Sequence, residues 1–175
     1  MKNFVVMLVS SLMIISIITS CGQKSEEDLF ATAEQMEMEE KFEDALVKYE
    51  RILVEYPNTE KAADIYFRIA QLSGNLKRFQ RCVDSYEKII ELNPDHPMAP
   101  KAQFMVGYIY ANELKNMGKA KRAYEKFLES YADVDSGMTA SANFELKYMG
   151  KDISEIDFLN DLASKSETKT TEKSN

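Results

Sequence analysis

The sequence predicts an all-α protein built from repeated helix pairs. The first observation is a motif that occurs three times, as YERILVEYPN, YEKIIELNPD and YEKFLESYAD, beginning at Tyr49, Tyr86 and Tyr124. These tyrosines lie 37 and 38 residues apart, and a fixed period of this length is typical of stacked supersecondary units. The second observation is that apolar or small residues recur around each tyrosine at the spacing of one helix face. Together they predict three similar units stacked along the chain.

Within each unit, the tyrosine marks the second helix of the pair. A small residue stands four positions before each tyrosine, on the same helix face, and proline follows two of the three helices, which cannot continue past it. The third helix has Ala132 at the corresponding position. We expect the following residues to pack or end the repeats: Ala45, Tyr49, Pro57, Cys82, Tyr86, Pro94, Ala120 and Tyr124.

The three pairs are expected at residues 26–57, 60–94 and 98–132, so that the repeats span 26–132. Ser25, followed by Glu26, Glu27 and Asp28, resembles an N-cap with an acidic first turn, and it opens a helix over 26–40. The remaining helices are predicted at about 42–56, 60–72, 78–92 and 98–114, with a sixth ending near 131. The turns are expected at Ser73-Gly74-Asn75, at residues 93–97 and at Gly118.

After the repeats, residues 133–163 are expected to form capping helices that cover the last apolar face. One helix is predicted at 138–149, closed by Gly150, and a shorter one at 152–162, opened by Asp152 and Glu155. Residues 164–175 contain Ser, Thr, Lys and Glu with nothing to bury, and we predict that they are disordered.

Residues 1–20 have the pattern of an export signal. A short basic start precedes an apolar run that is shorter than a membrane-spanning helix, and Ile18-Thr19-Ser20-Cys21 follows. This ending resembles the lipobox of bacterial lipoproteins, which implies cleavage before Cys21 and a covalent lipid on it. An uncleaved anchor or an ordinary signal with an incidental Cys is the alternative. Residues 21–25 would then be a short tether, and Gly22 in place of Asp favours the outer membrane, facing the periplasm.

The paired helices resemble the tetratricopeptide repeat over about residues 28–132. In that family the first helix of each pair carries a small residue where its partner approaches, and Ala33, Ala70 and Gly107 match this position. The small residue, aromatic and terminal proline of the family's second helix match the residues given above. The resemblance implies a right-handed α-solenoid of about three helix pairs. The long repeats and their Tyr-Pro endings are similar to a bacterial periplasmic subgroup.

Composition and charge exclude several function classes. Lys and Arg number 22 against 29 for Asp and Glu, and a net charge of −7 argues against nucleic-acid binding. The single His, His96, lies in a turn between two prolines, where a helix-start role is expected rather than catalysis. No phosphate loop, paired-Cys metal spacing or dinucleotide motif occurs, so we expect no enzyme, metal, cofactor or small-molecule substrate, and no pocket with convergent titratable groups. Cys82 is expected to be a small buried thiol, and the acidic cluster of residues 37–44 a solvated face.

A stacked array of helix pairs offers a concave groove lined by the first helices. Candidate groove residues are Tyr66, Arg68, Gln71, Gln103, Tyr108 and Asn112, although each could be an ordinary surface residue. An extended peptide or a partner helix could lie there. The lipid anchor and repeats resemble the BamD-type lipoproteins of outer-membrane β-barrel assembly, and alternatively the CpoB-like envelope coordinators. The expected function is therefore a membrane-anchored scaffold for protein partners in the cell envelope, with an enzyme or solute-binding component as the rival.

Overall fold

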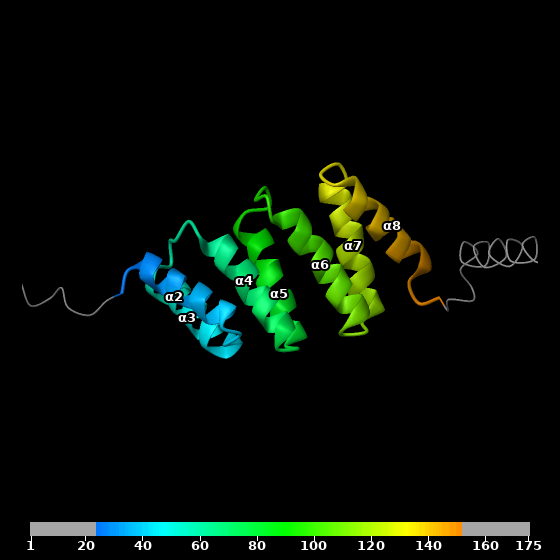
Figure 1. Cartoon of the computed structure of the whole chain (residues 1–175). Coiled ribbons are helices and arrows are strands. Elements are labelled where there is room, and N and C mark those ends of the chain that lie inside the picture. Colours follow the sequence, from blue (N-terminus) through cyan, green and yellow to red (C-terminus); the bar gives the residue numbers. More distant parts are fainter. Residues whose placement is uncertain (1–23, 152–175) are drawn as a thin grey trace, which may run out of the picture. The chain divides into compact units, whose positions relative to one another are not determined.

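The computed structural model describes residues 24–151, and every regular element within them is a helix (Figure 1). Cys21, the predicted helix at 152–162 and the tail lie outside the described residues. The chain divides into two compact units after Pro57, and each is described by itself. The helices are α2 (Glu26–Met38), α3 (Phe42–Glu55), α4 (Ala62–Asn75), α5 (Phe79–Leu92), α6 (Ala99–Asn112), α7 (Met117–Tyr131) and α8 (Ser136–Tyr148). Among residues 24–151, no helix has the length and apolarity to cross a membrane.

The first unit is the helix pair α2 and α3. The Ser25 hydroxyl accepts a hydrogen bond from the Asp28 N–H at 3.1 Å, which confirms the predicted N-cap. Tyr49 is fully buried, packs edge-on against Phe30 with ring centroids 5.5 Å apart, and donates its hydroxyl to Glu37 Oε2 at 3.0 Å. The interpretation of Glu37 as part of a solvated face is therefore wrong, because its carboxylate holds the buried tyrosine.

In two of the helix pairs, a tyrosine near the end of the second helix donates a hydrogen bond to the segment that precedes the first helix. The Tyr56 hydroxyl donates to the Lys24 carbonyl at 2.9 Å, and the Tyr131 hydroxyl donates to the Pro94 carbonyl, also at 2.9 Å. Each acceptor lies just before the first helix of the same pair. Asn93 stands at the corresponding position in the middle repeat, which therefore has no tyrosine to form this bond.

The second unit holds α4 to α8, in which consecutive helices pack against one another. Tyr86 is 3% exposed and packs edge-on against Phe67, with centroids 5.8 Å apart. Tyr124 is fully buried and packs against Phe104 at 5.4 Å. The α4 to α7 core contains both aromatic and small side chains, and a second cluster joins Tyr124 and Phe127 to Ala142 of α8. The all-α fold class is confirmed.

The residues predicted to pack the repeats divide into two groups. Six are buried as expected, namely Ala45, Tyr49, Cys82, Tyr86, Ala120 and Tyr124. Pro57 and Pro94 are exposed, so a packing role for them is wrong. Each proline lies within two residues of the end of a helix, which agrees with a role in ending α3 and α5.

Two of the predicted turns lie inside helices. Ser73-Gly74-Asn75 is the last turn of α4, because Leu72 and Ser73 are fully buried and helical packing continues through them. The chain instead reverses after α4 at Lys77, whose φ is 56°. Gly118 lies in the first turn of α7, and the reversal before it is at Lys115, with φ 52°. Both left-handed positions are occupied by Lys, which gives no turn signal in a sequence.

The start of α8 is fixed by Asp135, whose carboxylate accepts the N–H groups of Gly137 and Met138 at 2.8 and 2.9 Å. The helix therefore begins at Ser136, two residues before the predicted start. Gly150 follows its end with φ 77°, as a helix-terminating glycine does.

Cys82 is 4% exposed, and burial raises the pKa of its thiol to about 12, in agreement with the prediction of a small buried thiol.

Removal of the tyrosine hydroxyl should have different effects on the free energy of unfolding in the first and third repeats. The Tyr124 hydroxyl is buried without a hydrogen-bond partner among the described residues, whereas the Tyr49 hydroxyl donates to Glu37. We expect Tyr49→Phe to lower the free energy of unfolding by about 1–2 kcal/mol and Tyr124→Phe to leave it unchanged or raise it. Urea denaturation of the two variants checks this. Equal losses for both would mean that the Tyr124 hydroxyl has a partner in solution.

Candidate functional site

The helix α6 presents two functionally distinct sides. Lys101, Tyr108 and Asn112 lie within about 40° of one another around the helix axis at 100° per residue. Gln103, Val106 and Tyr110 lie on the opposite side of the same helix, about 120° to 180° away. The first side belongs to a surface of first helices, and the second borders a cavity.

We define the first-helix face by Phe67, Lys101, Tyr108 and Asn112, which come from α4 and α6. Lys101 Nζ lies over the Phe67 ring, 5.1 Å from its centroid, which joins α6 to α4. Tyr108 is 41% exposed, and Asn112 Nδ2 donates to the Tyr108 carbonyl at 3.0 Å. Burial, and then the nearby Glu145 and Tyr108, raises the pKa of the Tyr124 hydroxyl of α7.

The six predicted groove residues are not all brought together. Tyr66 and Arg68 of α4 are half-buried, Gln71 is exposed, and Tyr108 and Asn112 share a side of α6. Gln103 is 8% exposed, and its Nε2 donates to the Ala123 carbonyl of α7 at 2.9 Å. Its assignment to the groove is therefore wrong, because it holds α6 against α7 on the opposite side.

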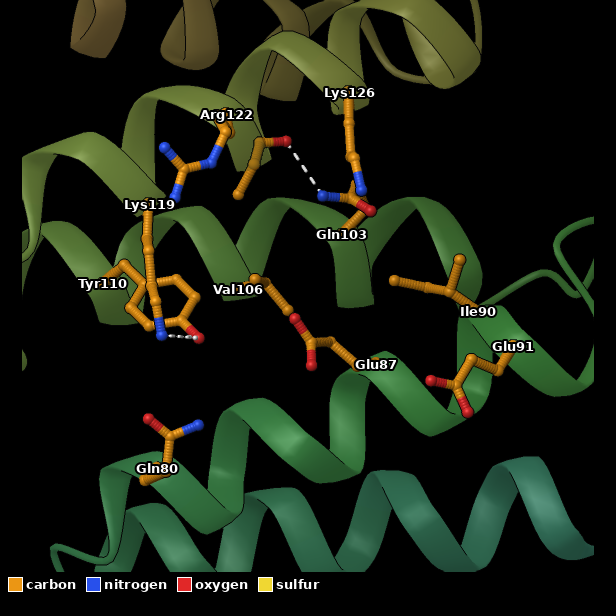
Figure 2. A pocket seen from close by; sticks show the side chains of 11 residues that line it. Gln80, Glu87, Ile90, Glu91, Gln103, Val106, Tyr110, Lys119, Arg122 and Lys126 are labelled. Carbon is orange, nitrogen blue, oxygen red and sulfur yellow. Dashed lines mark hydrogen bonds between the residues drawn. The ribbon is translucent and has the colours of Figure 1, made fainter.

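The cavity lies between α5, α6 and α7 and has a volume of about 610 Å³ (Figure 2). Its lining comes from Gln80, Glu87, Ile90 and Glu91 of α5, then Gln103, Val106 and Tyr110 of α6, then Lys119, Arg122, Ala123 and Lys126 of α7. The floor on α6 combines the apolar Val106 with the Tyr110 ring and the amide of Gln103. Ligand-binding clefts in proteins have volumes in this range.

The two sides of the cavity carry opposite charge. We call Glu87 and Glu91 of α5 the acidic wall, and Lys119, Arg122 and Lys126 of α7 the basic wall. Figure 2 shows Glu87 reaching towards the floor from α5, while Lys126 reaches towards it from α7. Among the described residues, no ion pair within 4.0 Å is recorded between the walls, and the pairs found near them join neighbours on one helix, as Lys88 and Glu91 do at 2.6 Å.

Among the charged side chains that line the cavity, Glu87 has a pKa that is shifted by its surroundings. Burial, and next the repulsion of Asp84 and Glu91, raises the pKa of the Glu87 carboxyl, while Lys119 and Lys126 oppose this shift. Lys119 Nζ lies over the Tyr110 ring, 4.9 Å from its centroid, and donates to its hydroxyl at 3.4 Å. The charge of Lys119 is thus held over an aromatic ring.

The expectation of no pocket with convergent titratable groups is wrong, since five charged side chains line this one. The lining offers carboxylate, ammonium, guanidinium, amide and phenol groups, which can bind charged or polar groups of a partner. His96 lies elsewhere, at the start of α6, where its Nδ1 accepts the Met98 N–H at 3.2 Å. Among residues 24–151, no group of three or more acidic, His or Cys side chains could hold a metal ion.

The sequence did contain a signal for this site. Glu87 and Glu91 are four residues apart on one second helix, and Lys119, Arg122 and Lys126 recur at helical spacing on the next. Charges of one sign on one helix and of the other sign on the equivalent helix would have suggested facing walls. The predicted groove residues, in contrast, all lie on the first helices α4 and α6.

Replacing Glu87 should change how stability depends on pH. A carboxyl whose pKa is higher in the folded than in the unfolded state lowers stability as pH rises through this interval, starting near about 4.3. We expect Glu87→Gln to be more stable than the parent at pH 7, with the difference disappearing towards pH 4. Thermal melting across this pH range, with Glu125→Gln as a matched exposed control, measures it. A parent that gains stability relative to Glu87→Gln on raising the pH would contradict the direction.

Comparisons with known proteins address the fold. A tetratricopeptide-repeat family model matches residues 63–96, and a second one matches residues 101–133. The chain contains tetratricopeptide repeats. These two segments correspond to the second and third predicted pairs, and the first predicted pair, 26–57, lies outside both matches. No curated protein matches the sequence.

Solved structures with similar folds include several repeat proteins. The N-terminal domain of stress-induced protein-1 from C. elegans superposes with a TM-score of 0.60 at 19% identity, covering 70% of this chain and 94% of that domain. A tetratricopeptide repeat protein from Parabacteroides merdae gives 0.58 at 20% identity, covering 85% of this chain but only 54% of that protein. MamA gives 0.51 at 18% identity, covering 70% of this chain and 75% of that one.

These similarities establish an α-solenoid of tetratricopeptide repeats. Repeats of this type imply a scaffold for protein–protein interaction, with protein or peptide partners. In the repeat framework, α4 and α6 are first helices, α5 and α7 are second helices, and α8 occupies the position of a further first helix. The cavity therefore lies on the second-helix side of the repeats.

Proposed function

We propose that this repeat protein is a non-enzymatic, lipid-anchored scaffold of the bacterial cell envelope, and that the first-helix face binds its protein partner. The observation that supports a binding role is the exposed Tyr108 beside Lys101 and Asn112 on a first helix of a tetratricopeptide repeat. Partly exposed aromatic and cationic side chains are enriched where proteins bind each other.

The anchor is supported by the sequence of residues 1–21. The thiol of Cys21 would carry a diacylglyceryl group and its amino group a further acyl chain, and several chains hold a protein on a bilayer where one would not. Cys21→Ser should abolish labelling by radioactive palmitate and leave the signal uncleaved. A processed, unlabelled parent protein of mature length would show that an ordinary signal peptidase acts instead.

Gly22 favours transport to the outer membrane, which sucrose-gradient separation of the two membranes tests.

Among envelope roles, assembly of outer-membrane β-barrel proteins is one candidate, because a lipid anchor combined with Tyr-Pro repeats is similar to BamD-type lipoproteins. Coordination of envelope and cell-wall synthesis, as in CpoB-like proteins, is the alternative. The deciding experiment is mild crosslinking in cells, detergent extraction and identification of the captured proteins by mass spectrometry. A β-barrel protein with periplasmic domains supports the first role, and cell-wall synthases or division proteins support the second.

The same capture experiment tests the first-helix face. Tyr108→Ala should reduce the yield of the specific partner at least several-fold, because it truncates the exposed aromatic at the centre of the face. Leu92→Ala is the matched control, since Leu92 is 54% exposed on a second helix. If both variants capture the partner as well as the parent does, the first-helix face is not the binding surface.

A further inference from the structure

The cavity between α5, α6 and α7 lies on the side of α6 opposite the first-helix face, and the proposed function does not use it. We infer that it is a second binding site, which takes a short peptide segment carrying a basic and an acidic side chain on either side of an apolar one. The basic side chain would meet the acidic wall, and the acidic side chain would meet the basic wall.

The two walls of the cavity are complementary in charge to a ligand that carries both signs. Glu87 and Lys126 line a cavity of about 610 Å³ from opposite walls, and among the described residues no ion pair joins the walls. Glu91 is paired with Lys88 of its own helix at 2.6 Å, so within residues 24–151 Glu87 is the carboxylate of the acidic wall that has no such ion pair. Figure 2 shows Glu87 of the acidic wall and Lys126 of the basic wall directed towards the space between the helices. Opposite charges that are held apart by the backbone are left for a ligand to bridge, and charged hydrogen bonds to a ligand are stronger than neutral ones.

The surface between the walls offers both apolar contact and a fixed polar group. Val106 and Ile90 supply apolar surface between the walls, and the buried amide of Gln103 is fixed by its hydrogen bond to the Ala123 carbonyl. That bond uses one donor of the amide, and an amide oxygen can still accept from a peptide N–H. The floor thus combines an apolar contact with a fixed polar group, which is the usual composition of a ligand site.

The charges and the size of the cavity disfavour polyanions, lipid headgroups and a whole helix as ligands. A phosphate or an anionic lipid headgroup would be attracted by the basic wall but repelled by Glu87 and Glu91 on the opposite wall. The net charge of −7 opposes polyanions as well. A volume of this size suits a few residues of extended peptide rather than a whole helix. The raised pKa of Glu87 indicates that a cation arriving beside it would relieve an unfavourable charge.

The test uses the full-length chain in detergent and three probe peptides, with binding followed by amide chemical shifts in NMR spectra. The probes are acetyl-Lys-Leu-Glu-amide and its two neutralised forms, in which Gln replaces either Lys or Glu. We expect the charged probe to shift amides of α5 and α7, and each neutralised form to bind roughly fivefold more weakly. Sodium chloride should weaken the charged probe most.

The variants assign each wall to one end of the probe. Glu87→Gln should bind the probe with Lys no better than the form in which Gln replaces Lys, and it should still prefer Glu over Gln at the other end. Lys126→Gln should lose the preference for Glu over Gln and keep the preference for Lys over Gln. Lys121→Gln and Glu125→Gln make the same charge changes on the exposed side of α7, and both preferences should survive in them. Circular dichroism confirms that each variant is folded.

Three results would overturn the inference. The charged probe could cause no shifts, the controls could weaken it as much as the wall variants do, or Glu87→Gln and Lys126→Gln could affect both ends of the probe equally. Capture of a partner through the first-helix face is measured separately with Tyr108→Ala. Failure of one site therefore leaves the test of the other intact.

Discussion

Tyr86→Ala is expected to lower the free energy of unfolding by about 3–5 kcal/mol. Tyr86 is 3% exposed, lies in the core that joins α4 to α7, and packs edge-on against Phe67. Truncation removes a large aromatic side chain from the middle of the second unit and leaves a cavity that neighbouring helices can only partly fill. Denaturant unfolding followed by circular dichroism measures the loss.

The matched control is Tyr108→Ala, which removes the same side chain from an exposed position on α6. We expect it to change the free energy of unfolding by less than about 0.5 kcal/mol. An unchanged melting temperature for Tyr86→Ala would mean that the repeat register is wrong, because the tyrosines that define the period would then lie outside the core.

Gly107→Ala is expected to cost about 1–3 kcal/mol, although alanine is ordinarily the better helix former by about 1 kcal/mol. A Cβ at position 107 would lie 2.8 Å from both Cδ1 and Cε1 of the Tyr124 ring. That ring is fully buried and packs against Phe104, so it cannot move aside without disturbing the α6 and α7 core. The clash therefore outweighs the gain in helix propensity.

Gly74→Ala provides the opposite result in the same unit. A Cβ at position 74 would meet only the Cys82 sulfur, at an ordinary distance of 3.9 Å, within the last turn of α4. We expect this variant to be as stable as the parent or more stable by up to about 1 kcal/mol. If the two glycine variants melted at the same temperature, the close approach of α6 to α7 at Gly107 would be refuted.

The two glycines show what sequence patterns can and cannot distinguish. Gly107 was predicted to permit a close approach, because it matches Ala33 and Ala70 in the repeat alignment, and the contact with Tyr124 agrees with this. Gly74 was assigned to a turn, because glycine next to serine and asparagine is typical of turns. Burial of Leu72 and Ser73 extends α4 through it, and this tertiary contact overrides the local preference.

The candidate site divides in the same way. The side of α6 that carries Tyr108 could be predicted, because residues off the apolar stripe of a first helix must face outwards. Gln103 could not be placed correctly, since an amide is expected at a surface and its hydrogen bond to a carbonyl of another helix has no local signature. The cavity depends on how far apart α5 and α7 lie, a distance that no periodicity encodes.

The sequence by itself determined the helical class, the period of the repeats and six of the side chains that hold them together, because these follow from spacing along one helix face. It also located the caps at Ser25 and Gly150, which depend on neighbouring residues only. The tertiary structure decided which polar residues are buried, where lysines turn the chain and how the charges of α5 come to face those of α7. Each of these depends on contacts between residues distant in sequence, and such contacts exist only once the helices pack.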